Sequence, residues 1–227
     1  MGSYLSLIAL SLCCVAAIGW GGLDVCRKWL GERLDPIAVT AWLSLFQVPF
    51  FGIWWLLEGQ IDLVGYFWVG LGLVALNAVA LVLFVWAVRI APLSLTIPYL
   101  SFSPVFVAWA AFLILDEKLS GLQWLGSVFV VFGGLVLNAE RGMGFFGLFT
   151  GLRRSPGALL MLLTAVLWSI AMPLDKLALG SAHVSTHGLL QNLGIGIVLT
   201  LILLRAPASR RGFLDGGRHH FIMLLGS

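Results

Sequence analysis

The distribution of apolar and polar residues along the chain is dominated by long apolar runs separated by short polar turns. Most of the runs approach or exceed the roughly 20 residues with which an α-helix crosses the hydrocarbon core of a bilayer, and longer helices fit by tilting. Pro residues and small groups of charged residues mark the turns between the runs. The pattern predicts an all-α polytopic membrane protein with seven complete transmembrane helices over residues 4–28, 36–57, 64–88, 93–115, 122–137, 157–174 and 185–204, and the start of an eighth over residues 221–227.

The longest polar connection divides the chain into two units. Residues 140–156 contain several Phe residues between arginines, which is typical of a segment lying at the membrane interface. We expect a first unit over residues 1–139, an interfacial linker over residues 140–156 and an incomplete second unit over residues 157–227. Because the eighth apolar run has no room to cross a bilayer, we expect the chain to be truncated at its C-terminus.

Composition agrees with a membrane protein. Hydrophobic residues make up 60% of the 227 residues and charged residues only 10%, whereas a soluble domain carries about 25% charged residues. The basic residues lie in the connections between helices, so the positive net charge reflects membrane orientation and does not predict binding of nucleic acid. We expect a multi-pass protein of a membrane, with the bacterial inner membrane as the expected location.

A group of charged residues lies within the first apolar run. Trp20, Asp24, Arg27 and Lys28 are spaced so that they share one face of a helix. A charge at membrane depth costs roughly 2.5–3.5 kcal/mol on insertion scales, so it normally faces protein or water. We interpret Asp24 as a candidate proton or cation site and Lys28 as a candidate site for anionic groups. The alternative is a plain ion pair between Asp24 and Lys28 at the end of the helix.

Polar residues in the other apolar runs recur at helical spacing and form narrow stripes. Interhelical hydrogen bonds, worth about 0.6 kcal/mol each, are sufficient to explain a single stripe. Stripes on several helices are better explained by a shared polar cavity near the centre of the membrane. The stripes contain Thr40, Ser44 and Gln47; Asn77; Thr96, Tyr99 and Ser103; and His187, Gln191 and Asn192.

The fourth apolar run contains Pro98 and Pro104. Each proline lacks a backbone N–H and frees a carbonyl about one turn earlier, which lipid cannot satisfy. One interpretation is a kink without functional meaning. The other is a break in the helix that lines a substrate path, as in transporters with discontinuous helices.

Candidate sites for metals, cofactors or catalysis are weak. Cys13, Cys14 and Cys26 lack metal-binding spacing and are expected to be small buried hydrophobic residues. The doublet His219–His220 lies in a basic loop and does not by itself predict a metal site. Motifs of hydrolytic enzymes such as HExxH and GxSxG are absent from the sequence. We therefore expect no cofactor and no enzymatic activity.

Several short motifs, in their order and spacing, resemble the EamA-type drug/metabolite transporters. The resemblance covers the first unit almost completely, and Trp20 with Lys28 and Asp35-Pro36 also fit the first helix of that family and the turn after it. The second unit matches more loosely, through Trp168 followed eight residues later by Lys176. The motifs are Ala87-Val-Arg-Ile-Ala-Pro-Leu-Ser-Leu95, Ser103-Pro-Val-Phe106, Asp116-Glu-Lys-Leu119, Gln123-Trp-Leu-Gly126 and Gly133-Gly134.

The resemblance implies ten helices in two five-helix repeats of inverted topology, with residues 1–139 as the first repeat and residues 157–227 as part of the second. It also implies a secondary transporter, expected to be an exporter, that moves a small metabolite or amino-acid-like solute by alternating access. The expected partners are this small molecule, the lipid bilayer, and either a second copy of the chain in a homodimer or the missing C-terminal helices. The expected substrate-binding residues are Trp20, Asp24, Lys28, Gln47, Asn77, Tyr99, Ser103, Trp168 and Gln191.

Two other classes of function stay open. The first is a non-transporting membrane fragment or scaffold that needs a partner chain, which the short second unit favours. The second, an integral-membrane enzyme, is the least favoured because the sequence lacks a clustered set of catalytic groups.

Orientation in the membrane is predicted differently by two arguments. The first, third, fifth and seventh connections carry most of the basic residues, including Arg33, Arg89 and Arg205, whereas the opposite side carries only Lys118 and Lys176. Basic residues near helix ends stay in the cytoplasm, so the charges predict an N-terminus outside. The resemblance implies an N-terminus in the cytoplasm. We favour the charges, because the bias extends over four separate connections.

Overall fold

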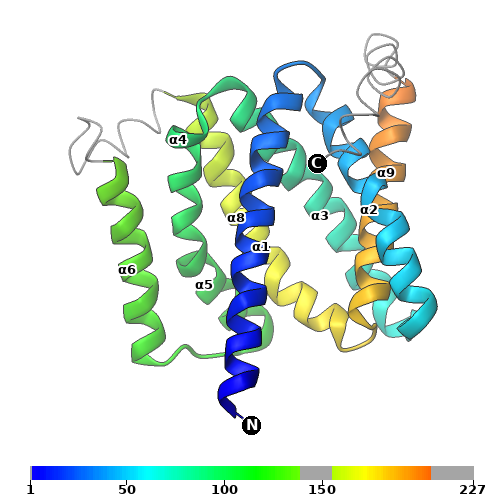
Figure 1. Ribbon diagram of the computed structural model, residues 1–227, viewed down its shortest axis with the longest axis horizontal. Coiled ribbons are helices and arrows are strands. Elements are labelled where there is room, and N and C mark those ends of the chain that lie inside the picture. The colour runs from blue at the N-terminus through cyan, green and yellow to red at the C-terminus, as the bar shows by residue number, and fades with distance from the viewer. Residues whose placement is uncertain (1, 139–154, 206–227) are drawn as a thin grey trace.

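The computed structural model describes residues 2–138 and 155–205, and every regular element in these two ranges is helical (Figure 1). The predicted interfacial linker and the predicted start of an eighth helix lie outside the described residues, except for Ser155 and Pro156 at the beginning of α8. The elements are α1 (Gly2–Gly31), α2 (Pro36–Glu58), α3 (Leu63–Ile90), α4 (Leu93–Thr96), the 3₁₀-helix η1 (Ile97–Phe102), α5 (Ser103–Leu115), α6 (Gly121–Asn138), α8 (Pro156–Leu179) and α9 (Val184–Arg205).

Within residues 2–138 and 155–205, six helical segments are long and apolar enough to cross a membrane: α1, α2, α3, the composite α4–η1–α5, α8 and α9. The predicted fifth transmembrane helix corresponds to α6, whose apolar stretch Gly121–Gly134 is shorter than the other six. The prediction of a multi-pass, all-helical membrane protein is therefore confirmed. The count of seven complete transmembrane helices is confirmed for six of them.

Local sequence explains where the helices begin. Pro36 and Pro156 occupy first-turn positions, where the missing N–H would have had no partner within the helix. The side chains of Asp35 and Ser155 precede them and accept hydrogen bonds from backbone N–H groups of the first turn. Asp62 caps α3 in the same way, through the N–H of Val64. The caps of α2 and α3 follow short turns, which bring these helices next to the helices before them.

The fourth transmembrane segment is broken where the two prolines predict it. Between α4 and α5 the chain winds as η1, and Pro98 and Pro104 occupy the first turns of η1 and α5 respectively. The Ser101 hydroxyl donates a hydrogen bond of 2.7 Å to the carbonyl of Pro98. The break is thus a defined 3₁₀ segment, as is common where a helix must accommodate residues that cannot donate.

The interior is formed by two helix pairs, in which α3 packs along α8 and α2 packs along α9 (Figure 1). Ala87 of α3 and Ala91, which follows this helix, meet Gly157 of α8, so the two backbones approach closely. Small residues at such contacts give membrane helices van der Waals packing that lipid cannot replace. The largest buried side chain in this region is Phe84, which is 1% exposed.

We expect Gly157→Leu to destabilise the protein by about 1–3 kcal/mol, the usual cost of adding side-chain volume to a packed interface. A Cβ atom at this position would lie 2.6 Å from the Cβ of Ala91 and 3.1 Å from the backbone carbonyl of Ala87. The measurement is the thermal unfolding midpoint in detergent. Gly72→Leu on α3 is the matched control, because a Cβ atom there meets nothing within 4 Å. Equal midpoints for the two variants would contradict the close packing.

The outer helices α1 and α6 are exposed over much of their length. On α1 the free cysteines Cys13 and Cys14 are exposed and Cys26 is half-buried. The prediction that the cysteines are buried is therefore wrong for Cys13 and Cys14. A small apolar residue on a transmembrane helix is equally stable facing lipid or facing the protein interior, so sequence alone could not distinguish these two environments.

Candidate functional site

Side chains from six elements surround a cavity in the middle of the molecule. One part has a volume of about 490 Å³ and lies between α1, α2, α3, α8 and α9. An adjoining part of about 420 Å³ extends to α5, and Trp20, Asn77 and Trp168 line both parts. We call the two parts the central cavity. Its polar and aromatic walls are Trp20, Arg27, Gln47, Asn77, Ser103, Trp168, Ser169, Asp175 and Asn192.

Five of the nine residues predicted to bind substrate line the central cavity. They come from five different elements, and they are Trp20, Gln47, Asn77, Ser103 and Trp168. Asn77 makes no hydrogen bond to any of the described residues, so its amide is available to a ligand. Gln47 and Asn192 each donate to a carbonyl of their own helix, at 3.2 and 2.9 Å. The prediction that several polar stripes meet in one space is confirmed for these positions.

The remaining stripe residues make contacts within the protein. Thr40 is buried and donates to the carbonyl of Pro36. Tyr99 is 2% exposed and belongs to the apolar cluster around Phe84, Val88 and Met161. These two side chains lie in the packed interior and do not line the central cavity.

Asp24 pairs with Arg27. The carboxylate Oδ1 of Asp24 lies 3.0 Å from Nη1 of Arg27, one helical turn further on. The alternative interpretation, an ion pair between Asp24 and Lys28, is therefore wrong, because the partner of Asp24 is Arg27. Nζ of Lys28 instead donates a hydrogen bond of 2.6 Å to the carbonyl of Val88 and lies 3.2 Å from Oε1 of Glu32. Its positive charge interacts favourably with the partial negative charges of the last carbonyls of α3, because the dipole of a helix favours a cation at the C-terminal end.

Arg27 is the residue that prediction from sequence left out of the binding set. It is 5% exposed and lines the central cavity. Its guanidinium carbon lies 5.4 Å from the centre of the Trp20 ring and 5.1 Å from that of Phe84, distances at which aromatic faces stabilise a cation. The signal was present, because Arg27 shares a helix face with Trp20 and Asp24.

Gln191 belongs to a chain of polar contacts that connects three helices. Its amide nitrogen donates to the hydroxyl of Tyr66 at 3.3 Å and to the carbonyl of Gly70 at 3.0 Å. The Tyr66 hydroxyl lies 2.9 Å from Nδ1 of His187. Nε2 of His187 lies 3.2 Å from Oδ1 of Asp175, an ion-pair distance without the alignment of a hydrogen bond. Gln191 therefore reaches the central cavity indirectly, through Asp175.

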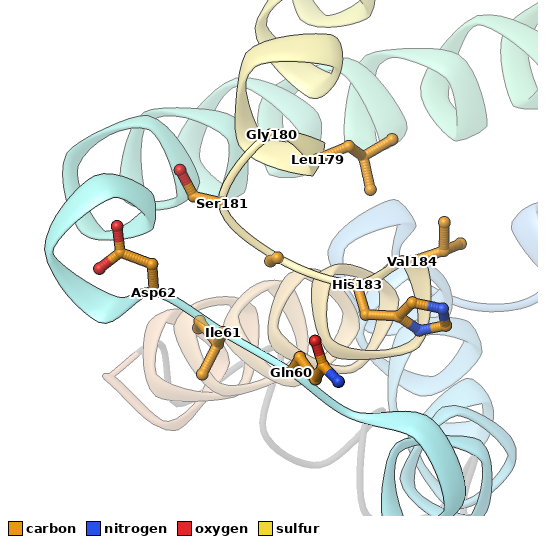
Figure 2. A pocket seen from close by; sticks show the side chains of 9 residues that line it. Gln60, Ile61, Asp62, Leu179, Gly180, Ser181, His183 and Val184 are labelled. Atoms are coloured by element: carbon orange, nitrogen blue, oxygen red, sulfur yellow. The ribbon is translucent and has the colours of Figure 1, made fainter.

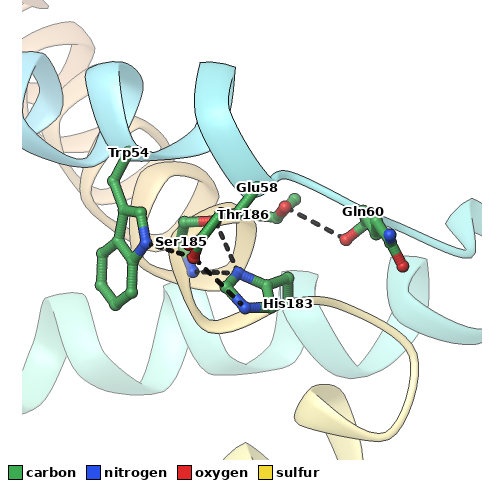
Figure 3. A network of polar contacts seen from close by, with 6 residues as sticks. All are labelled: Trp54, Glu58, Gln60, His183, Ser185 and Thr186. Atoms are coloured by element: carbon green, nitrogen blue, oxygen red, sulfur yellow. Dashed lines mark hydrogen bonds and ion pairs between the residues drawn. The ribbon is translucent and has the colours of Figure 1, made fainter.

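A second pocket, of about 490 Å³, lies at the turns that join α2 to α3 and α8 to α9 (Figure 2). The two turns are paired through backbone hydrogen bonds, in which Asp62 donates to Ser181 at 2.7 Å and His183 donates to Gln60 at 2.9 Å. Side chains add to this pairing, as Thr186 donates to the carbonyl of Gln60 (Figure 3). The pocket is thus part of a structured connection between the α2–α3 turn and the α8–α9 turn.

A small polar network covers this connection (Figure 3). The indole of Trp54 donates to Glu58 at 2.8 Å, and the same carboxylate oxygen lies 3.9 Å from Nε2 of His183. Nδ1 of His183 lies 2.8 Å from the Ser185 hydroxyl. Among residues 2–138 and 155–205, no group of three or more His, Cys, Asp or Glu side chains has the arrangement of a metal site. The doublet His219–His220 lies outside these residues.

Comparison with known proteins identifies the first unit. The sequence model of the EamA-like transporter family matches residues 7–139, more than half of the chain. The match includes most of α1 and all of the elements from α2 to α6. Neither the curated proteins nor the solved structures contain a match to the chain.

Proposed function

Because this chain belongs to the EamA-like transporter family, we propose that it is a secondary transporter that moves a small metabolite by alternating access through the central cavity. The family assignment agrees with the motifs between residues 87 and 134, and the chain is a multi-pass membrane protein. One observation carries the proposal: polar and aromatic side chains from six helical elements converge on a single space. Lipid offers such side chains no partners, so their convergence favours a solute-binding role.

The walls of the cavity indicate how a solute would be held. Trp20 and Trp168 offer flat apolar faces, and Asn77 offers an amide without an intramolecular partner among the described residues. Ser103 lies at the start of α5, directly after the 3₁₀ segment. We assign these residues, with Gln47, to the substrate site. Tyr99 and Gln191 support the walls from behind, and export is the direction that we propose.

Support for the inverted arrangement comes from the path of the chain. In Figure 1, α1 runs away from the end of the molecule where the N-terminus lies, whereas α8 runs toward that end. Trp20 of α1 and Trp168 of α8 face the same cavity. This is the relation expected if the two helices are the first members of two inverted repeats.

We expect Asn77→Leu to lower solute flux at least about tenfold, because the substitution keeps the branched shape of the side chain but removes a hydrogen bond that the solute would make. Flux is measured in sealed vesicles with a panel of labelled small metabolites. Thr200→Val is the matched control, because it changes a half-buried polar residue of α9 that does not line the cavity and whose buried hydroxyl has no partner among the described residues. Flux that persists unchanged in Asn77→Leu would contradict the proposed site. A folded, inserted protein without any flux would favour the scaffold alternative.

A further inference from the structure

The buried Arg27 has more hydrogen-bonding capacity than the protein uses. An arginine side chain carries five N–H donors in a planar fork. Within the described ranges, the hydrogen bond from Nη1 to Asp24 is the one that its guanidinium makes. The side chain is 6% exposed. A guanidinium that is this deeply buried, paired through one nitrogen and open to a cavity can accept a second anionic partner.

The position of Arg27 makes the N–H donors of its guanidinium accessible from the central cavity. Trp20 and Phe84 lie near the guanidinium, so the aromatic contacts hold it in place without using its N–H groups. Arg27, Trp20 and Asn77 line the same part of the central cavity. The rest of a molecule whose anionic group binds Arg27 would therefore lie in the part of the cavity that Trp20 and Trp168 also line.

On these grounds we propose that Arg27 binds the carboxylate of an organic acid with an apolar or aromatic body, and that a proton binds Asp24 together with it. The proposal rests on the transport function proposed above and specifies its substrate class. Asp24 and Arg27 form a neutral pair in the empty site. When a solute carboxylate takes the place of Asp24 on Arg27, one negative charge is left uncompensated in a medium of low dielectric constant.

A proton from water removes this charge, because the Asp24 side chain is 25% exposed. It binds a carboxylate oxygen of Asp24, which leaves Arg27 paired with the solute and the site neutral again. No covalent bond of the solute changes. The solute would thus cross the membrane as an anion accompanied by one proton, in an electroneutral step.

Other ionisable groups near the cavity are engaged elsewhere. Among the described residues none of them pairs with Asp24, and Glu58 of α2 lies at the far end of its helix. Lys28 contacts Glu32 and the carbonyl of Val88. The groups on or next to the helices around the cavity are Lys28 on α1 and Glu32 just after it, Tyr66 and Arg89 on α3, Asp175 and Lys176 on α8, and His187 on α9 with His183 just before it.

The test uses radiolabelled phenylacetate and the purified protein. We expect saturable binding that phenylacetamide, which has the same shape without the charge, does not compete. Arg27→Gln should weaken binding by about ten- to a hundredfold, since charge-assisted hydrogen bonds are lost. Arg33→Gln is the matched control, because Arg33 is an exposed arginine near the same end of α1 that stacks on Trp29. Equal affinity for the amide, or equal binding by the two variants, would overturn the assignment.

The proton is tested separately, with a pH indicator in weak buffer. Phenylacetate should cause proton uptake, and its affinity should rise as the pH falls from about 8 to about 6, because binding consumes a proton. Asp24→Asn keeps an oxygen that can accept from Arg27 but cannot ionise, so this variant should bind phenylacetate with no pH dependence. An unchanged pH dependence in Asp24→Asn would overturn the role of Asp24.

Two further outcomes separate this inference from the transport function. In the first, phenylacetate, benzoate and hexanoate all fail to bind, while a neutral solute is transported and its transport requires Asn77. The assignment of a carboxylate to Arg27 is then wrong, and the proposed transport function is retained. If no solute is transported and none binds, both fail.

Discussion

Replacing Asp24 with Ala is expected to destabilise the protein by about 3–5 kcal/mol. The substitution leaves the guanidinium of Arg27, with a side chain 6% exposed, without the carboxylate that it contacts at 3.0 Å. Breaking a buried ion pair by removing one partner has this cost, because the remaining charge stays desolvated. The measurement is the free energy of unfolding in mixed detergent micelles.

The double variant Asp24→Ala/Arg27→Met separates pairing from packing. Replacing a buried ion pair by apolar residues of similar volume is often neutral or stabilising by about 1–4 kcal/mol, so we expect the second substitution to restore most of the lost stability. Glu32→Ala provides the contrast, because the Glu32 side chain is 53% exposed and its partner Lys28 also contacts the carbonyl of Val88. Exposed pairs contribute about 0–1 kcal/mol. A double variant less stable than Asp24→Ala would show that the ion pair is not the cause.

The second large effect concerns orientation. We expect a single cysteine at position 120 to be labelled by an impermeant thiol reagent on intact cells, and one at position 32 to stay unlabelled. Ser120 lies in the turn between α5 and α6, and Glu32 lies in the turn between α1 and α2, at opposite ends of the molecule (Figure 1). The reason is that Arg33, Arg89 and Arg205 lie at the Glu32 end, and basic residues near helix ends stay in the cytoplasm.

Both substitutions suit the structure. Ser120 and Glu32 are exposed, and neither change removes a basic residue. Gly59 is a poorer site, because a Cβ atom there would collide with the side chain of Trp55. The background protein needs Cys13, Cys14 and Cys26 replaced, since all three are free. Labelling of position 32 with protection of position 120 would reverse the orientation and favour the one implied by the family.

Much of the fold could be predicted from hydropathy, because a membrane forces backbone groups to be satisfied within each helix. The helix boundaries followed from Pro and Asp at turn positions such as Asp35-Pro36. The central cavity could be predicted because Gln47, Asn77 and Trp168 are polar or aromatic residues on otherwise apolar helices. What sequence could not provide was which of two neighbouring cations turns inward. Arg27 and Lys28 differ by one residue, about 100° around the helix.

The fourth transmembrane segment shows why Tyr99 and Ser103 do not face the same side, although their spacing in the sequence predicts that they do. In a regular α-helix, Tyr99 and Ser103 lie about 40° apart, so they would share a face. Through η1 each residue turns by about 120°, and four such steps place the two side chains about 120° apart. Tyr99 therefore enters the packed cluster while Ser103 reaches the cavity. Two prolines predict a break but do not fix its helical pitch.

The same 3₁₀ segment also sets the length of the segment it interrupts. Its six residues rise about 2.0 Å each where an α-helix rises about 1.5 Å, so η1 adds about 3 Å to a segment that must span about 30 Å of hydrocarbon. Rewinding η1 as α-helix would draw the α5–α6 turn inward by about 3 Å and rotate α5 by about 120° at once. A shift of α5 along its axis and a rotation of α5 about that axis are therefore coupled, because both depend on whether these six residues wind as 3₁₀-helix or as α-helix.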